Sequence, residues 1–469
     1  MTGSHELTTG DAIATRLRAQ RDGFLADGAP DLKQRRLWLD GLALGLRAWR
    51  GRFAQAVMED FGHRPVAETA ALEILPTLRG ISYLRFVLPD FLRKQERNVP
   101  LLLQPGLAYV LYQPLGVVGI VSPWNYPLAL SLMPLATALA AGNRVMLKPS
   151  ELTPRTNALL AAFLGELFPP TQVSVVTGDA TVGAEFSALP FDHLFFTGSP
   201  AVGRLVMRAA AESLTPVTLE LGGKSPAIIA PGGMTTRAVT SIAHGKLANA
   251  GQTCIAPDYA LVPEAERDRF VDLFTASYRK LYPAGPAGPD MTAIISDHHK
   301  ARLLALLDDA TAQGGRIVAL GTDHGRRLAP RLVLDTRPGM AIMREEIFGP
   351  VLPVVTYAGL DEALAHINAG ERPLALYYFG GASGRRKVLS ATTSGNVTLG
   401  NTLLHYAVND MPFGGIGESG MGAYHGLEGL QRLSHAKGVF HPAPWHPTAL
   451  LRPPFGKLPR RLLKLLIGR

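Results

Sequence analysis

Five short runs rich in β-branched or aromatic residues constrain the fold of this chain more than any other feature. The runs lie between Val117 and Leu221 and have the sequences VVGIV, RVMLK, VSVVT, HLFFT and VTLEL. The segments between them, near 128–141, 154–168, 180–188 and 200–213, carry alanine and leucine at helical spacing. This alternation predicts an α/β fold with a parallel sheet and covering helices.

In open parallel sheets, ligands bind beyond the carboxyl ends of the strands. The loops that follow the five runs are therefore the first places to search for a site. They span residues 122–127, 149–153, 178–179, 198–200 and 222–223.

The rest of the chain divides around this unit. Residues 226 to about 394 contain helix-like segments at 234–250 and 264–282 and predict a second α/β domain that faces the first across a cleft. Residues 11–97 have helical periodicity and no chemistry that we can identify, so we expect them to serve packing. The run 99–116 predicts a β-hairpin with Pro105 and Gly106 in its turn, which would protrude and pair with another subunit.

Bulk composition agrees with a large globular protein. A chain of 469 residues exceeds the size at which one core stops growing, so two or three sub-domains are expected. With 47% hydrophobic and 18% charged residues, disorder is disfavoured. One cysteine cannot form an internal disulfide, the opening residues do not resemble a secretory signal, and no apolar run reaches about 20 residues. We therefore expect a cytoplasmic location.

The net charge of +9 is concentrated at the C-terminus. Residues 450–469 carry six basic residues and no acid, which leaves +3 for the rest of the chain. No basic stripe interleaved with aromatic residues runs through the body, so we expect no nucleic-acid partner.

The tail itself predicts an amphipathic basic helix. Its apolar face carries Leu458, Leu462, Leu465 and Leu466, and its polar face carries Arg460, Arg461 and Lys464. Such a helix is too short to span a bilayer. Docking on the protein itself or on a subunit is the favoured interpretation, and peripheral contact with an anionic membrane surface is the alternative.

Cys254 lies in the small, flexible sequence Gly-Gln-Thr-Cys. An isolated cysteine is most often a buried small hydrophobe. An ordinary thiol is only a few per cent thiolate at neutral pH, so a nucleophilic role needs an activating base. Glu220, near the end of the fifth run and followed by two glycines after Leu221, is a candidate for that base, and a structural ion pair is the alternative.

Two further loops carry groups suited to a ligand. Asn125, within Pro-Trp-Asn-Tyr-Pro, can donate a side-chain amide hydrogen bond to an oxyanion, or it can fix its own turn between the prolines. Glu346 and Phe348 form an acid and aromatic pair that suits a sugar hydroxyl and a flat ring. A surface acid beside a core aromatic residue is the alternative.

The loops after the second and fourth runs suit a nucleotide. Residues 198–203 join a strand to a helix, where a phosphate could bind, although they lack the G-x-G-x-x-G spacing and an empty turn is equally consistent. Lys148 and Glu151 can hydrogen-bond sugar hydroxyls. A carboxylate there repels a 2′-phosphate and favours NAD, whereas a solvated surface pair is the alternative.

Seven motifs together resemble the aldehyde dehydrogenase superfamily in their order and context. They are PWNYP, KPSE, FTGS, ELGGKSP, GQTC, EEIFGPV and PFGGIGESG, and they extend over nearly the whole chain. The short N-terminus, GQTCIAPDY and SGMGAYHG resemble the class 3 branch, with coniferyl aldehyde dehydrogenases closest in appearance. The resemblance implies a parallel Rossmann-type cofactor domain, an α/β catalytic domain and a small oligomerisation arm.

The resemblance implies a catalytic set of three residues. Cys254 would be the nucleophile, Glu220 the general base, and Asn125 would form the oxyanion hole with the backbone N–H of Cys254. Attack on an aldehyde gives a thiohemiacetal, loss of hydride gives a thioester, and water activated by Glu220 then releases the acid. A glutamate at this position separates hydrolytic members from relatives that release an acyl-CoA. A non-catalytic protein that keeps the fold is a second alternative.

The resemblance also implies binding residues for NAD, with use of NADP open. Lys148 and Glu151 would hold the adenosine ribose, Ser199 would approach the pyrophosphate, and Glu346 and Phe348 would hold the nicotinamide ribose and ring. The remaining expected cofactor contacts are Ser122, Pro123, Trp124, Ser150, Gly178, Gly198, Gly203, Leu221 and Gly222. Tyr126, Met133 and Phe413 match positions that line the substrate tunnel, and they suggest an apolar or aromatic aldehyde. We assign no metal site.

The expected domain division follows from the same resemblance. Residues 1–98 and 114–219 would form the NAD(P)-binding domain and residues 220–397 the catalytic domain. Residues 99–113 and 398–449 would bridge subunits in a homodimer, and residues 450–469 would form the basic tail. Gly400-Asn401 departs from the family, where Asn-Asp is usual, and predicts a rearranged loop with activity retained.

Overall fold

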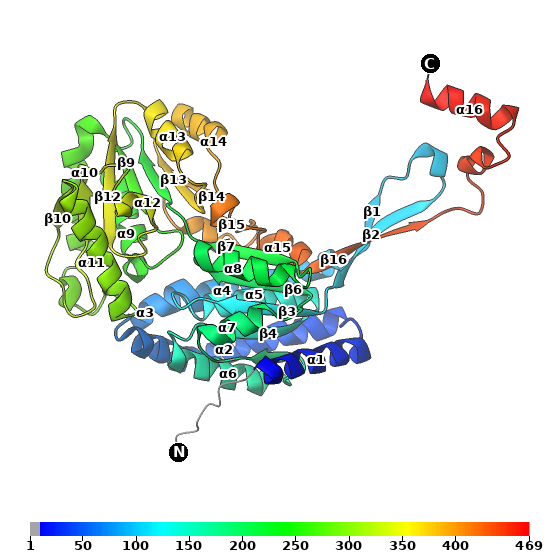
Figure 1. Ribbon diagram of the computed structural model, residues 1–469, viewed down its shortest axis with the longest axis horizontal. Helices are drawn as coiled ribbons and strands as arrows, with labels where there is room; N and C mark the ends of the chain where they lie inside the picture. The colour runs from blue at the N-terminus through cyan, green and yellow to red at the C-terminus, as the bar shows by residue number, and fades with distance from the viewer. Residues whose placement is uncertain (1–9, 469) are drawn as a thin grey trace.

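The five predicted strands lie in one sheet in the computed structural model, which describes residues 10–468 (Figure 1). The six strands lie in the order β15-β7-β6-β3-β4-β5. Five of them pair in parallel, as predicted. Their bounds are β3 Val117–Ser122, β4 Arg144–Pro149, β5 Val173–Val175, β6 His193–Gly198 and β7 Val217–Leu221. The sixth strand, β15 (Gly420–Met421), was not predicted and runs antiparallel to β7.

Helices cover this sheet close to the predicted positions. Those between the strands are α5 (Ala129–Ala141), α6 (Pro154–Leu167), α7 (Ala180–Ser187) and α8 (Pro200–Ala211). The N-terminal helices α2 (Leu32–Phe61) and α4 (Leu75–Phe91) pack with α5 and α6 on one face of the sheet, whereas α1 (Gly10–Asp27) packs with α7 and α8 on the other face. A short helix, α3 (Val66–Thr69), and a π-helical turn, η1 (Ala70–Ile74), join α2 to α4. Leu39, Leu42, Leu46 and Trp49 of α2 are buried, which confirms the predicted packing face.

The second α/β unit contains a seven-stranded sheet in the order β10-β11-β12-β9-β8-β13-β14. Its strands are β8 Pro226–Ile229, β9 Tyr259–Pro263, β10 Arg316–Ala319, β11 Arg331–Leu334, β12 Val351–Tyr357, β13 Ala375–Phe379 and β14 Asn396–Leu399. Only the pair β10 and β11 is antiparallel. Its helices are α9 Thr236–Leu247, α10 Arg267–Leu281, α11 Asp297–Ala312, α12 Ala341–Arg344, α13 Leu360–Ala369 and α14 Ala382–Ala391.

The helix predicted at 234–250 ends earlier than expected. The chain leaves α9 at Leu247, and Asn249 and Ala250 adopt left-handed conformations with φ of 51° and 52°. Side chains seldom adopt this conformation, so helical periodicity could not reveal the turn. The turn redirects the chain toward Cys254.

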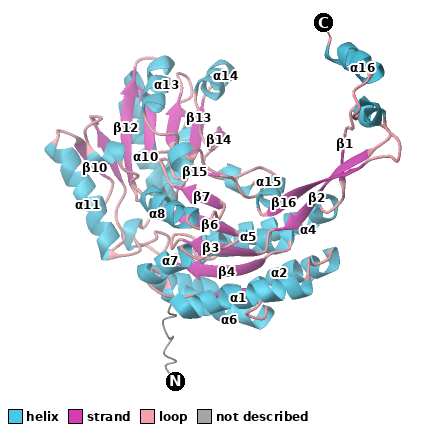
Figure 2. Ribbon diagram, turned by 45° about the vertical axis from the view of Figure 1, so that its right-hand side comes forward, coloured by secondary structure: helices cyan, strands magenta, loops and turns pink. Residues whose placement is uncertain are grey.

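A three-stranded antiparallel sheet projects from the body as an arm (Figure 2). It consists of β1 (Gln95–Arg97), β2 (Leu107–Pro114) and β16 (Ser434–His441). The predicted hairpin is therefore correct in its second strand and wrong in its first, because residues 101–103 form a 3-10 turn. Pro100 and Pro105 lack the N–H that a ladder needs, and pairing moves to residues 95–97.

The predicted tail helix is present as α16 (Lys457–Ile467), which lies beyond the arm (Figures 1 and 2). Its Leu458, Leu465 and Leu466 side chains are exposed to solvent within this single chain. A second short helix, α15 (Gly426–Arg432), leads into β16. None of the helices within residues 10–468 is long and apolar enough to cross a membrane.

Candidate active site

A cavity of about 1020 Å³ is lined by loops from both α/β units. Loops after β3, β6 and β7 contribute from the first sheet, and the segments around residues 254, 299, 346 and 370 contribute from the second unit. Ten of the predicted site residues line it: Pro123, Trp124, Asn125, Gly198, Ser199, Glu220, Gly222, Cys254, Glu346 and Phe348. The cleft expected at the carboxyl ends of the strands is therefore present, and it contains all three candidate catalytic side chains.

The Cys254 loop is held by close backbone packing. Gly251 follows the two left-handed residues with φ of 75°. A Cβ atom at Gly251 would lie 2.4 Å from the carbonyl oxygen of Gly349. Only glycine fits at this position, so the cysteine loop packs directly against the loop that carries Phe348.

The Gln252 side chain also holds this loop in place. Its fully buried amide donates to the carbonyl oxygens of Asn249 and Ala293 across 3.0 and 3.1 Å, and it accepts from the Ile295 N–H across 2.9 Å. Three buried hydrogen bonds from one side chain restrict its rotation. The glutamine of the GQTC sequence is therefore a scaffold for its neighbour, a role that motif reading did not assign.

The loop after β3 is tied to the cysteine loop at two points. The side-chain amide of Asn125 donates to the carbonyl oxygen of Gln252 across 3.0 Å. The Tyr126 hydroxyl and the Thr253 Oγ1 are 2.7 Å apart. One amide hydrogen of Asn125 is committed to Gln252, and the other is left for a ligand in the cavity.

Burial dominates the electrostatics of the candidate catalytic groups. It raises the pKa of the Cys254 thiol, and the charges of Glu346 and Glu220 raise it further. Burial alone raises the pKa of Glu220 well above the ordinary glutamate value. Burial, aided by Asp258, raises the pKa of Glu346 to about 8, against the lowering effects of the Gly223 N–H, Lys224 and Arg302. Perturbed groups that share one cleft are typical of active sites.

Several buried polar atoms in this cleft have no hydrogen-bond partner within residues 10–468. They are both carboxyl oxygens of Glu220, Oε1 of Glu346 and the Thr197 hydroxyl. Buried polar groups normally have partners, so these atoms indicate a ligand that supplies hydroxyl or water hydrogens. These acceptors therefore fit a ribose hydroxyl near Glu346 and a water near Glu220.

The turn into α8 suits the phosphates of a dinucleotide. The Ser199 side chain caps α8 by accepting from the Val202 N–H across 3.4 Å, and Ser199 lines the cavity. A Cβ atom at Gly203 would lie 2.7 Å from Cδ2 of Leu221, so glycine lets α8 approach β7 closely. A helix N-terminus at this place favours anions.

Lys148 and Glu151 form an ion pair at 3.3 Å after β4. The Lys148 side chain is buried, whereas the Glu151 side chain is 45% exposed. Neither residue lines the large cavity, and neither do Ser150 or Gly178. These residues lie at the same sheet edge as the cavity, because parallel strands end there together.

The structure places the remaining predicted residues in the core near the site. Ser122 pairs its hydroxyl with that of Ser131 at 2.7 Å, and Leu221 is buried against Gly203. Met133 is buried in α5 and packs against Gly80. Tyr126, Met133 and Phe413 do not line the large cavity.

Phe413 belongs to an aromatic cluster, which we define as Tyr406, Phe413, Tyr424 and His425. The ring centre of Phe413 lies 5.2 Å from that of Tyr406, 5.7 Å from that of Tyr424 and 5.6 Å from that of His425. Burial raises the pKa of Tyr406 and of Tyr424, and the Cys254 charge contributes to both shifts. Cys254 packs against the same hydrophobic core that contains Phe413 and Tyr424.

Some cavity residues were missed by sequence reasoning. Lys224 donates to the carbonyl oxygens of Ile342 and Glu345 across 2.8 and 2.9 Å and pairs with Asp258. Arg302 donates to the Ile347 carbonyl oxygen across 2.8 Å and also to that of Glu346. Lys224 stands within a quoted motif, so its position could have been noticed, but Arg302 has no local signal.

The departure at Gly400-Asn401 forms an ordered turn. Gly400 adopts φ of 72°, and Asn401 accepts from the Ser241 hydroxyl across 2.6 Å and from the Thr402 N–H across 2.8 Å. These bonds attach the turn to α9 rather than to the large cavity.

Comparisons with known proteins agree with this geometry. The sequence profile described as "Aldehyde dehydrogenase family" matches residues 4–439. The "Probable coniferyl aldehyde dehydrogenase" of Pseudomonas aeruginosa is 48% identical over 452 residues, which cover 96% of this chain and 95% of that protein. The solved structure "Substrate bound state of Staphylococcus Aureus AldH" has a TM-score of 0.92 at 34% identity and covers 97% of this chain and 99% of that one.

A solved cofactor complex is also similar. The "NAD+ complex structure of aldehyde dehydrogenase from bacillus cereus" has a TM-score of 0.85 at 26% identity, and it covers 93% of this chain and 90% of that one. With a family match over most of the chain and a shared fold, this chain belongs to the aldehyde dehydrogenase family and is an enzyme that oxidises aldehydes with a nicotinamide cofactor.

Proposed function

We propose that this enzyme oxidises an aromatic aldehyde of the coniferyl type to its carboxylic acid, through a thioester on Cys254. The observation that carries the proposal is the convergence of Cys254, Glu220 and Asn125 on one cavity. The name of the Pseudomonas aeruginosa relative supports the same substrate class.

In the proposed mechanism, the thiol of Cys254 gives its proton to water in the cavity and Sγ adds to the aldehyde carbon. The carbonyl π electrons move to oxygen, and the free amide hydrogen of Asn125 and the Cys254 backbone N–H bind that oxyanion. One such donor typically contributes about 2.7–4 kcal/mol to lowering the barrier. A nicotinamide cofactor held by Glu346 and Phe348 would supply the hydride acceptor, and loss of the hydride from the carbon would leave a thioester on Sγ.

Glu220 then serves the second half of the reaction. Its carboxylate takes a proton from water as the water oxygen adds to the thioester carbon, and the thiolate of Cys254 leaves with the electrons of the C–S bond. Both carboxyl oxygens of Glu220 are buried and lack a partner in the described chain, so their capacity to accept a hydrogen bond from a catalytic water is unused. A hydrolytic outcome follows from this base, which argues against release of an acyl-CoA.

We propose NAD as the preferred cofactor, with NADP also accepted. The exposed Glu151 carboxylate disfavours a 2′-phosphate. The neighbouring Lys148 ammonium, 3.3 Å away, partly offsets that repulsion. The proposed binding residues are those given above for the ribose, the pyrophosphate and the nicotinamide ring.

We propose a homodimer built through the arm. Strands β2 and β16 extend from the body, and their sheet has only three strands, so its edges are open to a second copy. The exposed leucines of α16 support burial against that second copy. Light scattering of the full chain and of a variant that lacks residues 450–469 tests this, and sedimentation with anionic vesicles tests the membrane alternative.

The central experiment measures NADH formation with coniferaldehyde, benzaldehyde and a long-chain aliphatic aldehyde, beside the Cys254→Ala variant. We expect the highest kcat/KM with coniferaldehyde and no turnover in the variant. A higher kcat/KM with the aliphatic aldehyde would refute the substrate class alone. NADH formation that survives Cys254→Ala would refute the thioester mechanism.

A further inference from the structure

A fully buried ion pair lies in the N-terminal segment to which the sequence assigned only packing. Arg64 Nη1 and Glu73 Oε1 are 2.9 Å apart, and both side chains have no exposed surface. A buried ion pair is weak evidence for stability, because desolvation offsets its attraction and an apolar pair often stabilises more. Stability alone therefore does not explain why this ion pair is buried.

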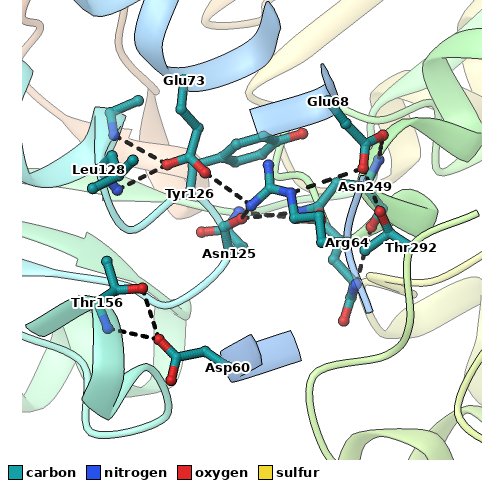
Figure 3. Close-up of polar contacts among 12 residues, drawn as sticks. Asp60, Arg64, Glu68, Glu73, Asn125, Tyr126, Leu128, Thr156, Asn249 and Thr292 are labelled. Carbon is teal, nitrogen blue, oxygen red and sulfur yellow. Dashed lines mark hydrogen bonds and ion pairs between the residues drawn. The ribbon is translucent and has the colours of Figure 1, made fainter. Parts of the chain in front are cut away.

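The two side chains form hydrogen bonds to both ends of the loop that carries Asn125 (Figure 3). Arg64 Nη1 donates to the backbone carbonyl oxygen of Asn125 across 3.1 Å, and its guanidinium lies 5.0 Å from the ring centre of Tyr126. Glu73 Oε2 accepts from the N–H groups of Leu128 and Ala129 across 2.8 and 3.2 Å, at the start of α5. Burial raises the pKa of Glu73, and the charge of Arg64 opposes that shift.

The same segment reaches the loop that carries Cys254. Glu68 accepts from the backbone N–H of Asn249 across 2.8 Å and from the Thr292 hydroxyl (Figure 3). Its carboxylate is 3.8 Å from Arg64 Nε. The Asn249 side chain in turn donates to the Asn125 carbonyl oxygen across 2.9 Å. The segment of residues 64–73 thus connects the two loops whose side chains must meet at the substrate.

The accuracy of this placement matters because Asn125 has a single free amide hydrogen. The other hydrogen is held by Gln252 across 3.0 Å. A shift of about 1 Å in a catalytic group can lower a rate about 10²-fold. The Asn125 carbonyl oxygen accepts hydrogen bonds from both Arg64 and Asn249, which fix the backbone of this residue.

We propose that Arg64, held by Glu73, is a positioning residue that fixes Asn125 and thereby forms the oxyanion hole. The inference rests on the proposed role of Asn125 as the oxyanion donor. It assigns to the segment between α2 and α4 a part in the rate of reaction and predicts that Arg64 acts through Asn125.

A double-mutant cycle tests the inference. Arg64→Met and Asn125→Ala should each lower kcat about 10²-fold or more, with KM changed less than about threefold. In the double variant, Arg64→Met should lower kcat by less than about twofold beyond Asn125→Ala, because the group it positions is already absent. Arg64→Lys keeps the ion pair and should recover part of the lost kcat.

A second readout separates positioning from general damage. Alkylation of Cys254 by iodoacetamide passes through no oxyanion, so its rate should change less than about threefold in Arg64→Met. Arg35→Met is the matched control, because buried Arg35 donates to the Ala140 carbonyl oxygen across 3.0 Å at the other end of α5. This control should lower Tm and leave kcat within about twofold of the parent enzyme.

The outcomes distinguish the two proposals. An unchanged kcat in Asn125→Ala would overturn the role of Asn125 itself. A large effect of Asn125→Ala with multiplicative effects in the double variant would overturn the positioning role of Arg64 alone. If Arg64→Met does not fold, Glu73→Gln replaces it in the cycle, since its amide oxygen still accepts from the Leu128 N–H. Glu73→Gln should give about a tenfold loss of kcat and the same lack of additivity.

Discussion

The amide nitrogen of Asn125 lies 3.0 Å from the carbonyl oxygen of Gln252, two residues before Cys254. This hydrogen bond joins a loop of the first sheet to a loop of the second α/β unit. The loop with the proposed oxyanion donor is therefore bonded directly to the loop with the proposed nucleophile. The geometry of the site depends on how firmly each of the two loops is held.

Replacement of Glu220 by glutamine should separate the two halves of the reaction. Thioester formation needs the cysteine and the oxyanion donors, whereas hydrolysis needs the carboxylate, and general bases contribute about 10²–10⁴-fold. We expect a pre-steady-state burst of NADH close to one per active site, followed by a steady rate at least about 10²-fold below the parent. Stopped-flow absorbance measures both phases.

The matched control for this variant is Glu371→Gln. Glu371 is an exposed carboxylate that also lines the large cavity. It should change the steady rate by less than about twofold. Loss of the burst together with the steady rate in Glu220→Gln would show that Glu220 is also required to activate the thiol.

The pH dependence of kcat follows from the buried state of Glu220. Burial raises its pKa above the ordinary value of about 4.3, and a general base works only when deprotonated. The kcat of the parent should therefore rise with pH along a limb placed above the ordinary glutamate range. A steady-state profile from pH 5 to pH 9 measures it, and Glu220→Gln should lack this limb. A flat profile in the parent enzyme would contradict the assignment.

Much of the fold could be predicted from periodicity. The five parallel strands and their helices fall within a few residues of the predicted segments, because each has a clear pattern of buried side chains. The arm was predicted only in part, since its first strand is three residues long and two prolines displace it. Strand β15, with two residues, has no pattern to recognise.

The site was predictable where chemistry is local and not where it depends on tertiary contact. Cys254, Glu220 and Asn125 stand in short motifs, and the structure brings them to one cavity. Arg64 lies 61 residues before Asn125 and has no motif, so only the folded chain shows the hydrogen bond between them. Gln252 was visible within a motif, yet its three bonds to distant backbone groups were not.

Glu346→Gln should weaken NAD binding. Hydrogen bonds to a charged group contribute about 1.5–3 kcal/mol, and the glutamine oxygen keeps part of that interaction, so we expect about a tenfold higher Kd. Because the pKa of Glu346 is raised to about 8, NAD binding to the parent should tighten as pH rises through that value and the carboxyl ionises. Quenching of tryptophan fluorescence, with Trp124 in the cavity wall, measures binding.

The variant should lose this pH dependence, since an amide does not ionise. Glu345→Gln is the control, because Glu345 is exposed and contributes its backbone carbonyl oxygen to Lys224. Its Kd should stay within about twofold of the parent. An equal pH dependence in Glu346→Gln and the parent would assign the titration to another group.

Gln252→Leu should destabilise the fold more than the loss of an ordinary buried glutamine. The change leaves the carbonyl oxygen of Ala293 and the N–H of Ile295 without their side-chain partner, whereas the Asn249 carbonyl oxygen keeps the backbone N–H of residue 252. Each buried group left unpaired costs about 1–3 kcal/mol, so the free energy of unfolding should fall by about 2 kcal/mol or more. Urea denaturation followed by circular dichroism measures the change.

Gln172→Leu is the matched control for that loss. Gln172 is also buried, but within residues 10–468 its side chain makes a single hydrogen bond, to the Asn143 carbonyl oxygen across 3.0 Å. We expect a loss of about 1 kcal/mol there and an unchanged kcat.

Gln252→Leu should in addition lower kcat in the fraction that remains folded, because the Gln252 backbone oxygen then no longer holds the Asn125 amide in place. Equal effects of the two substitutions on stability and on kcat would mean that the cysteine loop is held by its backbone packing at Gly251 and not by the Gln252 side chain.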